Sequence, residues 1–292
     1  MPEQRFIETN GVRLNVLQDG PPDGPLTILL HGFPEFSSGW RKQVPFLAAA
    51  GHRVWAPDQR GYALSDKPDA IAAYALDELA ADVIGLMDAA GCDRAFLVGH
   101  DWGAAVAWWV AQTHPERVAR LVVINVPHPA VMLAHLRGSL AQLLKSWYIF
   151  FFQLPWLPEW TLSLGNWRGL TRALTTGTRP GAFTEADLDA YREAWSRRGA
   201  MRSMLHWYRA IVRRPPAMPA EPRITVPTLM LWGVNDLALT RELAQPSIDL
   251  CDDGRLVFFE DASHWVHHEE PDRVNALIGA FLDAGEAPSP AA

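Results

Sequence analysis

Short continuous runs of hydrophobic residues recur along the chain, and each is followed by a turn-forming or polar residue. These runs cover residues 27–30, 54–56, 95–98, 121–124, 228–232 and 256–259. Apolar runs of this length are typical of strands that are buried on both faces of a parallel sheet. The segments 76–90 and 103–113 lie between such runs and have helical spacing. The alternation predicts a mostly parallel, doubly wound α/β sheet with helices on both faces, and residues 13–18 and 27–30 are expected to add an antiparallel edge pair.

The alternation stops between residues 128 and 218, where no apolar run is followed by a turn in the manner of a strand. Aromatic, arginine-rich segments with helical spacing and several prolines fill this stretch. It contains 12 Lys/Arg and 5 Asp/Glu, a charge of +7. Because the whole chain carries −7, the remaining residues carry −14. Such a shift in composition indicates an inserted subdomain. We predict an α/β core of residues 1–127 and 219–292, interrupted by a helical cap of residues 128–218.

Composition and charge exclude several classes of protein. With 292 residues, 49% of them hydrophobic, the chain is long enough for a sizeable core and too apolar for a disordered protein. No Lys/Arg run stands out against the net charge of −7, so nucleic acid is not expected as a partner. The most apolar long stretch, 147–160, is interrupted by Gln153, Pro155, Pro158 and Glu159, so no membrane span is expected.

Three smaller features refine this picture. The two cysteines, Cys92 and Cys251, provide no disulfide framework, and we expect both to be buried and reduced. The first residues lack the basic and apolar layout of a secretory signal, so a cytoplasmic location is expected. The 13 tryptophans indicate either a Trp-rich core or an aromatic pocket for an apolar ligand, and composition alone does not decide between them.

The segment Gly99-His100-Asp101-Trp102-Gly103 follows one predicted strand and opens a predicted helix. A polar residue with glycine two positions away on either side, in this context, is the pattern of a nucleophile elbow. Its side chain projects at the carboxyl end of the sheet, where open α/β sheets bind ligands. Here that residue is Asp101 rather than serine. A carboxylate that attacks an sp³ carbon forms an ester on the enzyme, so the segment predicts alkylation followed by hydrolysis.

A nucleophile elbow requires an acid and a histidine later in the chain. Asp236 follows the run 228–232, and His264 lies in the loop after the run 256–259. We expect Asp236 to orient the imidazole of His264, which would take a proton from the water that attacks the Asp101 ester. The remaining candidates are the alternative acids Asn235, Glu260 and Asp261, the histidines His267 and His268, which are expected to be exposed, and His100 and His128, whose spacing fits other roles.

The loop after the first buried run, His31-Gly32-Phe33-Pro34-Glu35, is placed to complete an oxyanion hole. We expect the backbone N–H groups of Phe33 and Trp102 to stabilise the tetrahedral anion that forms on the Asp101 carboxyl during hydrolysis. Donors of this kind contribute roughly 2.7–4 kcal/mol each in comparable sites. His31 is expected to be a structural hydrogen-bonding residue rather than a catalyst.

Together these motifs resemble the α/β-hydrolase-fold epoxide hydrolases over nearly the whole chain. The resemblance is carried by residues 31–35, 60–65, 99–103 and 263–265 and, in the predicted cap, by residues 147–155 and 206–209. In that family two cap tyrosines bind the epoxide oxygen, and Tyr148 and Tyr208 occupy the matching motifs. Two phenols can polarise the ring and protonate the alkoxide that develops when it opens. The resemblance implies an α/β-hydrolase fold with an inserted helical cap and an enzyme that needs no cofactor and no metal.

The resemblance also implies a small apolar epoxide as the substrate and a vicinal diol as the product. Trp40, Phe151 and Trp265 are the candidate substrate contacts. The particular epoxide, its regio- and enantioselectivity, and the biological role, for which detoxification is one candidate, stay open. The oligomeric state stays open as well, with a homodimer through the cap as one alternative.

Haloalkane dehalogenases are the main alternative, because they share the aspartate elbow and the tryptophan after it. They usually carry asparagine or another halide donor where this chain has Phe33, and they lack the paired cap tyrosines. Fluoroacetate dehalogenases usually carry arginine where this chain has Trp102, and a serine esterase would need serine at position 101. A non-catalytic small-molecule receptor is a distant alternative, because it leaves an intact nucleophile, acid, base and tyrosine pair unexplained.

Overall fold

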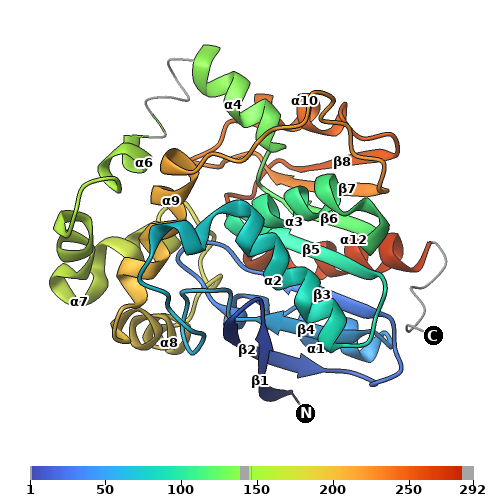
Figure 1. The fold of residues 1–292 in the computed structure, drawn as a ribbon, viewed down its shortest axis with the longest axis horizontal. Coiled ribbons are helices and arrows are strands. Elements are labelled where there is room, and N and C mark those ends of the chain that lie inside the picture. The colour runs from blue at the N-terminus through green and yellow to red at the C-terminus, as the bar shows by residue number, and fades with distance from the viewer. Residues whose placement is uncertain (1, 139–144, 146, 285–292) are drawn as a thin grey trace.

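The computed structural model describes residues 2–138, 145 and 147–284, which form one eight-stranded sheet with helices on both faces (Figure 1). The strand order is β1-β2-β4-β3-β5-β6-β7-β8. The strands are β1 Glu3–Thr9, β2 Val12–Asp19, β3 Leu26–Leu30, β4 Arg53–Pro57, β5 Ala95–His100, β6 Val118–Ile124, β7 Thr228–Gly233 and β8 Gly254–Phe259. All pairings from β4 through β8 are parallel. The six strands predicted from apolar runs are therefore confirmed.

The predicted antiparallel edge is wrong in its partners. Strand β2, which contains residues 13–18, pairs antiparallel with β1 and β4, whereas β3 lies inside the sheet and pairs parallel with β4 and β5. All five residues of β3 are buried, as a central strand requires, while most of β1 is exposed. Because β1 has no continuous apolar run, the hydrophobic pattern does not reveal the hairpin strand that forms the true edge.

Helices cover both faces of the sheet, and successive side chains along a strand pack against the helices of opposite faces. Along β3, Leu29 packs with α1 (Val44–Ala49) and α12 (Pro271–Asp283), whereas its neighbours Ile28 and Leu30 pack with α2 (Leu76–Ala89) and α3 (Trp102–Thr113). This alternation follows from the two-residue period of a strand. The helices predicted at residues 76–90 and 103–113 correspond to α2 and α3. The short helices α10 (Ala244–Ile248) and α11 (Val266–Glu269) complete the core.

Between β6 and β7 the described residues contain helices and irregular segments but no named strand. The helices are α4 Pro129–Gly138, α6 Trp147–Phe151, α7 Leu157–Thr175, α8 Glu185–Ser196 and α9 Ala200–Arg213. They extend from one end of the sheet in Figure 1. Helix α8 begins at a capping box in which Thr184 and Asp187 satisfy each other's backbone N–H groups. The division into core residues 1–127 and 219–292 and cap residues 128–218 remains a prediction that agrees with this arrangement.

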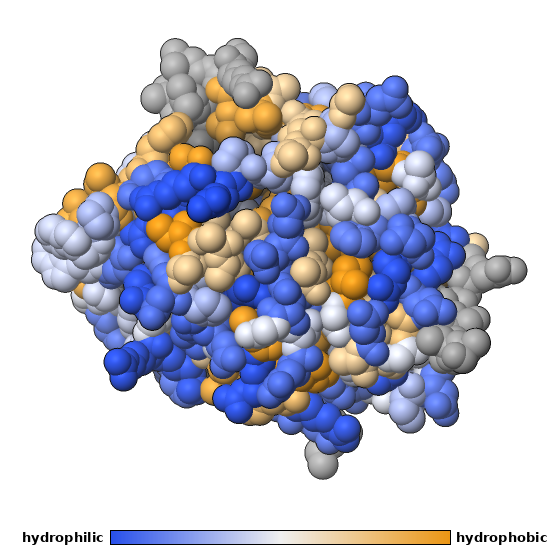
Figure 2. All heavy atoms as spheres, viewed as in Figure 1, coloured by the Kyte–Doolittle hydropathy of each residue, from blue (hydrophilic) through white to orange (hydrophobic). Residues whose placement is uncertain are grey.

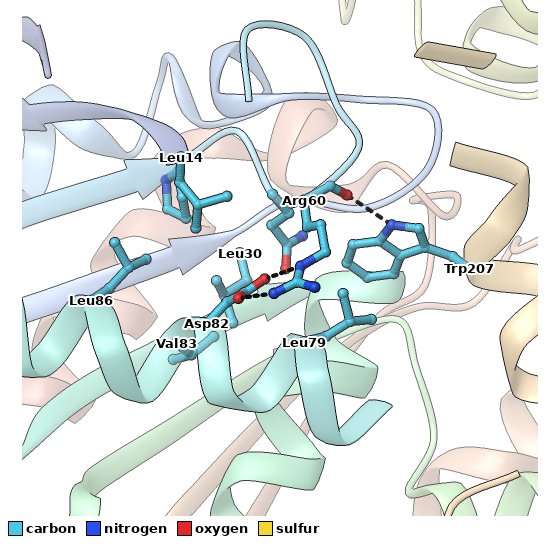
Figure 3. A pocket seen from close by; sticks show the side chains of 10 residues that line it. Leu14, Leu30, Arg60, Leu79, Asp82, Val83, Leu86 and Trp207 are labelled. Carbon is cyan, nitrogen blue, oxygen red and sulfur yellow. Dashed lines mark hydrogen bonds and ion pairs between the residues drawn. The ribbon is translucent and has the colours of Figure 1, made fainter. Parts of the chain in front are cut away.

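Buried tryptophans tie these helices to the sheet. The indole of Trp207 in α9 donates to the carbonyl of Arg60 at 3.0 Å, and the indole of Trp195 in α8 donates to the carbonyl of Pro34 at 2.6 Å. Arg60 in turn binds Asp82 of α2 through two nitrogens at 2.8 and 2.5 Å, and the three side chains lie together in Figure 3. The polar ends of the indoles thus fix the helical segment at defined points of the core.

Most large hydrophobic side chains that stay exposed lie outside the sheet-and-helix core, several of them on α6 and α7 at the left edge of Figure 2. No helix among the described residues is both long enough and apolar enough to cross a membrane. Cys92 and Cys251 are both buried and free, as expected.

We predict that Gly103→Ala destabilises the fold strongly. A Cβ at Gly103 would lie 2.0 Å from the carbonyl oxygen of Leu30, so β3 and α3 would have to separate. The free energy of unfolding in urea should fall by more than about 2 kcal/mol. Gly169→Ala is the control, because its Cβ would meet its nearest neighbour, Leu162, at 4.0 Å in α7. An unchanged midpoint for Gly103→Ala would contradict the close packing of β3 on α3.

Candidate active site

Asp101 lies at a strained turn between β5 and α3. Its backbone has φ 48° and ψ −125°, a left-handed region that a residue with a side chain rarely adopts. Strain of this kind costs roughly 1–3 kcal/mol and persists only where the surroundings enforce it. The loop after β3 approaches so closely that a Cβ at Gly32 would lie 2.2 Å from the Cβ of Asp101. The turn therefore has the geometry of a nucleophile elbow, and 20% of the Asp101 side chain remains accessible.

The loop after β3 supplies a backbone donor to the carboxylate. The N–H of Phe33 donates to Oδ1 of Asp101 at 2.7 Å. Trp102 is the first residue of α3, so its N–H is one of the donors that a helix leaves unpaired at its N-terminus. The Phe33 donor thus contacts Oδ1 of Asp101, the Trp102 N–H follows Asp101 at the start of α3, and Oδ2 lies toward His264.

His264 lies between two carboxylates. Its Nε2 is 3.5 Å from Oδ2 of Asp101, and its Nδ1 is 2.6 Å from Oδ2 of Asp236. The other oxygen of Asp236 accepts the N–H groups of Ala238 and Leu239 at 2.7 and 2.9 Å. The structure therefore brings together the predicted nucleophile, histidine and acid. The alternative acids Asn235, Glu260 and Asp261 are exposed.

The charges of this triad set its protonation. Burial favours a neutral Asp101, but the hydrogen bond and charge of His264, the charge of His100 and the N–H of Phe33 outweigh it, so the pKa of Asp101 lies below its usual range. Burial also disfavours a charged His264, yet the charges of Asp236 and Asp101 raise its pKa to about 10. At neutral pH the site therefore holds an ionised Asp101 beside an imidazolium.

Asn125 is a site residue that the sequence analysis did not identify. Its side-chain amide donates to Oδ2 of Asp236 at 2.9 Å and to the carbonyl of Gly233 at 3.1 Å, and its oxygen accepts the N–H of Gly233 at 2.8 Å. Asn125 thereby fixes the end of β7, from which Asp236 projects. Its position directly after the run 121–124, at the same edge of the sheet as Asp101, is the signal that could have identified it.

Tyr148 of α6 and Tyr208 of α9 meet above the elbow. Their ring centroids are 5.9 Å apart, and the ring of Tyr208 packs on those of Trp102 and Phe33 at 5.0 and 5.3 Å. Burial, reinforced by the negative charge of Asp101, raises the pKa of both phenols well above the usual value. Both hydroxyls consequently remain protonated at neutral pH and can act as donors close to the carboxylate.

The three candidate substrate contacts lie in different places. Trp265 is buried, with its ring 5.0 Å from that of His264 and its indole donating to the carbonyl of Ala173 in α7. Phe151 is half-buried on α6, 5.9 Å from the ring of Trp147. Trp40 is fully buried in the α1–α12 side of the core. Because no part of Trp40 is accessible, we do not retain it as a substrate contact.

A buried cluster around Glu35 lies behind His264. One oxygen of Glu35 accepts the hydroxyl of Tyr191 at 2.6 Å and Nε2 of His268 at 2.7 Å. The other oxygen lies 3.4 Å from Nδ1 of His100 and 3.5 Å from Nε2 of His267. Among the described residues, Glu35, His100 and His267 are the group that could together hold a metal ion. The sequence motifs at residues 31–35 and 99–103 contain Glu35 and His100, but the sequence pattern does not reveal the cluster that they form.

This cluster corrects the expectation that His267 and His268 are exposed. Each is only 1% exposed, because the short helix α11 turns both rings inward against Glu35. His100 connects the cluster to the triad, since its Nε2 lies 3.0 Å from the carbonyl oxygen of His264. His31 is also buried, and its Nε2 accepts the N–H of Gln59 at 3.0 Å, which confirms its structural role.

Comparisons with known proteins agree with this arrangement. The chain matches the alpha/beta hydrolase fold family over residues 25–271. It is 47% identical to the AB hydrolase superfamily protein YfhM of Bacillus subtilis (strain 168), over 95% of this chain and 97% of that protein, and 39% identical to Epoxide hydrolase 4 of Homo sapiens, over 94% of this chain and 77% of that protein. The crystal structure of Epoxide Hydrolase A from Mycobacterium thermoresistibile covers 98% of this chain, and all of that chain is matched, with 33% identity and a TM-score of 0.88.

A second solved structure, Bacillus megaterium epoxide hydrolase in complex with an inhibitor, shares 32% identity with a TM-score of 0.87 and covers 96% of this chain and 100% of its own. The fold and site define an α/β hydrolase with an aspartate at the elbow. The chain belongs to the alpha/beta hydrolase fold family and, within it, to the epoxide hydrolase family. The resemblance drawn from the sequence motifs is thereby confirmed.

We predict that Asp101→Asn lowers the pKa of His264 below its value of about 10. The imidazolium would lose one of its two stabilising negative charges and would release its proton at lower pH. A nitrogen-15 NMR titration of the histidine rings measures this change, with the His264 signal assigned by its absence in His264→Gln. Asp261→Asn removes an exposed carboxylate nearby and serves as the control. Equal pKa values in the wild type and Asp101→Asn would contradict the charge coupling.

Proposed function

We propose that this protein converts small apolar epoxides to vicinal diols through a covalent ester on Asp101. The observation that carries the proposal is the opposition of two kinds of group across one small site. A carboxylate nucleophile with its histidine and acid lies on the core side, and two phenols, the half-buried Tyr148 and the buried Tyr208, lie on the cap side. An epoxide between them would meet a nucleophile at its carbon and proton donors at its oxygen.

In the first step, an oxygen of the Asp101 carboxylate attacks an epoxide carbon and the bond between that carbon and the ring oxygen breaks. Oδ1 is already held by the N–H of Phe33, which leaves Oδ2 to form the new bond. The ring oxygen develops negative charge and takes a proton from Tyr148 or Tyr208. An alkoxide is a stronger base than a phenolate, so this transfer is favourable even though burial raises the pKa of both phenols.

In the second step, His264 removes a proton from a water molecule that attacks the carbonyl carbon of the Asp101 ester. Esterification removes the negative charge of Asp101, which is one of the two charges that hold the pKa of His264 near 10. The imidazolium then gives up its proton, which restores the phenol that protonated the ring oxygen, and the neutral imidazole becomes a base only after the ester has formed. The N–H groups of Phe33 and Trp102 stabilise the tetrahedral anion. On its collapse the bond between the carboxyl carbon and the diol oxygen breaks, that oxygen takes the proton that His264 removed from water, and the Asp101 acid returns a proton to the imidazole, which regenerates the carboxylate and the imidazolium.

Other aspects of the protein are hypotheses that accompany this function. We propose that Trp265 and Phe151 line the substrate space, because both lie on elements that adjoin the triad or Tyr148. The two free cysteines favour a cytoplasmic location, where thiols stay reduced. A role in detoxification and a homodimer through the cap are compatible with the site and are not required by it.

Replacing Tyr148 and Tyr208 by Phe tests the function. The double variant should lower the rate of diol formation from styrene oxide by roughly 10²–10⁴-fold, because the ring oxygen loses both proton donors, and each single variant should lower it less. Diol is quantified by chromatography, and halide release from 1-bromobutane is measured beside it. Tyr74→Phe is the control, because the Tyr74 hydroxyl binds the carbonyl of Pro68.

The wild type should release diol without halide. Halide without diol would assign the protein to the haloalkane dehalogenases, with Trp102 as a halide donor. Unchanged diol formation in the double tyrosine variant would remove the two phenols from the mechanism.

A further inference from the structure

Six large apolar side chains between residues 147 and 164 are exposed to solvent. Trp147 and Trp156 are 62% and 71% exposed, and Trp160 is 56% exposed. Phe150, Leu154 and Leu164 complete the set, which we call the tryptophan face. In Figure 2 the side of the molecule that carries α6 and α7 shows orange and pale spheres beside blue ones.

The members of the tryptophan face lie in one short stretch of chain, residues 147–164. Trp147 and Phe150 lie on α6, Leu154 lies in the turn after it, Trp156 immediately precedes α7, and Trp160 and Leu164 lie in the part of α7 before its backbone becomes helical again after a kink. In the same stretch, Phe152 and Pro158 are buried. The exposed residues are thus a separate apolar set beside those that pack inward. Exposed apolar patches mark surfaces that bind a partner.

The segment of the chain that contains the tryptophan face has a net positive charge. Residues 129–175 contain four basic residues and one acidic residue, Glu159. Glu159 forms an ion pair of 2.7 Å with the buried Arg209, so it presents no uncompensated negative charge. At the end of α9, the exposed Arg213 lies beside the turn after α6, where its guanidinium donates to the carbonyl of Gln153 at 2.9 Å.

We propose that the cap docks through the tryptophan face onto a membrane surface that contains anionic lipid. Tryptophan is the side chain most suited to the boundary between water and lipid, because its ring is apolar and its N–H can stay hydrated. Basic residues beside such a ring are attracted to anionic headgroups. Exposed apolar rings, the adjacent Arg213 and an acid that is already paired, Glu159, together match that chemistry.

A second copy of the chain fits the tryptophan face less well. A two-fold contact of cap on cap would bring two positively charged surfaces together, since the cap segment 128–218 carries +7. A contact of the cap with the −14 remainder of another copy would satisfy charge. That contact is head-to-tail, however, and such contacts close only into rings or continue as filaments.

Docking would place the membrane beside α6, the helix that carries Tyr148. The five-residue helix α6 carries Trp147 and Phe150 on its outer side and the half-buried Tyr148 between them. An apolar epoxide dissolved in the lipid would therefore enter next to one of its proton donors. This link to substrate rests on the proposed function, whereas the docking itself rests on the surface alone.

Vesicle co-sedimentation of the full chain tests the proposal. The wild type should bind vesicles that contain phosphatidylglycerol at least tenfold more tightly than vesicles of phosphatidylcholine, and binding should weaken as salt increases. The double variant Trp156→Ser/Trp160→Ser should bind the anionic vesicles at least tenfold more weakly. Phe6→Ser is the matched control, because Phe6 is 51% exposed on β1 and lies outside the cap.

Equal urea midpoints for the wild type and the double variant establish that the fold is intact. Unchanged hydrolysis of styrene oxide, measured without vesicles, separates docking from catalysis. The proposal is overturned if the wild type does not bind anionic vesicles or if the double variant binds them as tightly. A dimer in sedimentation equilibrium that the double variant abolishes, without vesicle binding, would identify the tryptophan face as a contact between copies instead.

Discussion

The rest of the site depends on the crowding of backbone around Asp101. The strained conformation of this residue, with φ 48° and ψ −125°, turns its carboxylate out of the sheet. Two glycines make the crowding sterically feasible, since a Cβ at Gly32 would lie 2.2 Å from the Cβ of Asp101 and one at Gly103 would lie 2.0 Å from the oxygen of Leu30. The same approach brings the N–H of Phe33 to 2.7 Å from the carboxylate. Packing of β3 on α3 therefore fixes the nucleophile and an oxyanion donor in one arrangement.

The two carboxylates on either side of the His264 imidazole control its proton affinity. Asp236, held by Asn125 and two backbone N–H groups, keeps its charge throughout the proposed cycle, whereas Asp101 loses its charge when the ester forms. The proton affinity of His264 therefore falls when a base is needed and rises again when the carboxylate returns. The protonated phenols of Tyr148 and Tyr208 add proton donors on the cap side without adding charge.

The sequence predicts those parts of the molecule that are encoded locally. Central strands are continuous apolar runs because both their faces are buried. Reactive side chains in the loops after such runs meet at one edge of the sheet, as Asp236 and His264 do. Burial that depends on distant segments is not visible in the same way. Trp40 and His267 illustrate this limit, because their rings pack on each other, 5.0 Å apart, across more than two hundred residues of chain. The exposed strand β1 and the bridging role of Asn125 depend likewise on partners far along the chain.

The central claim concerns the origin of the two diol oxygens. One is the former epoxide oxygen and the other comes from Asp101, because water attacks the ester at the carboxyl carbon. A single turnover in water labelled with oxygen-18, with enzyme in excess over styrene oxide, tests this most directly by mass spectrometry of the diol and of the peptide that contains Asp101. The account predicts an unlabelled diol from the first turnover and label in the Asp101 carboxylate. A labelled diol together with an unlabelled Asp101 would show that water attacks a substrate carbon instead of the carboxyl carbon and would contradict the account.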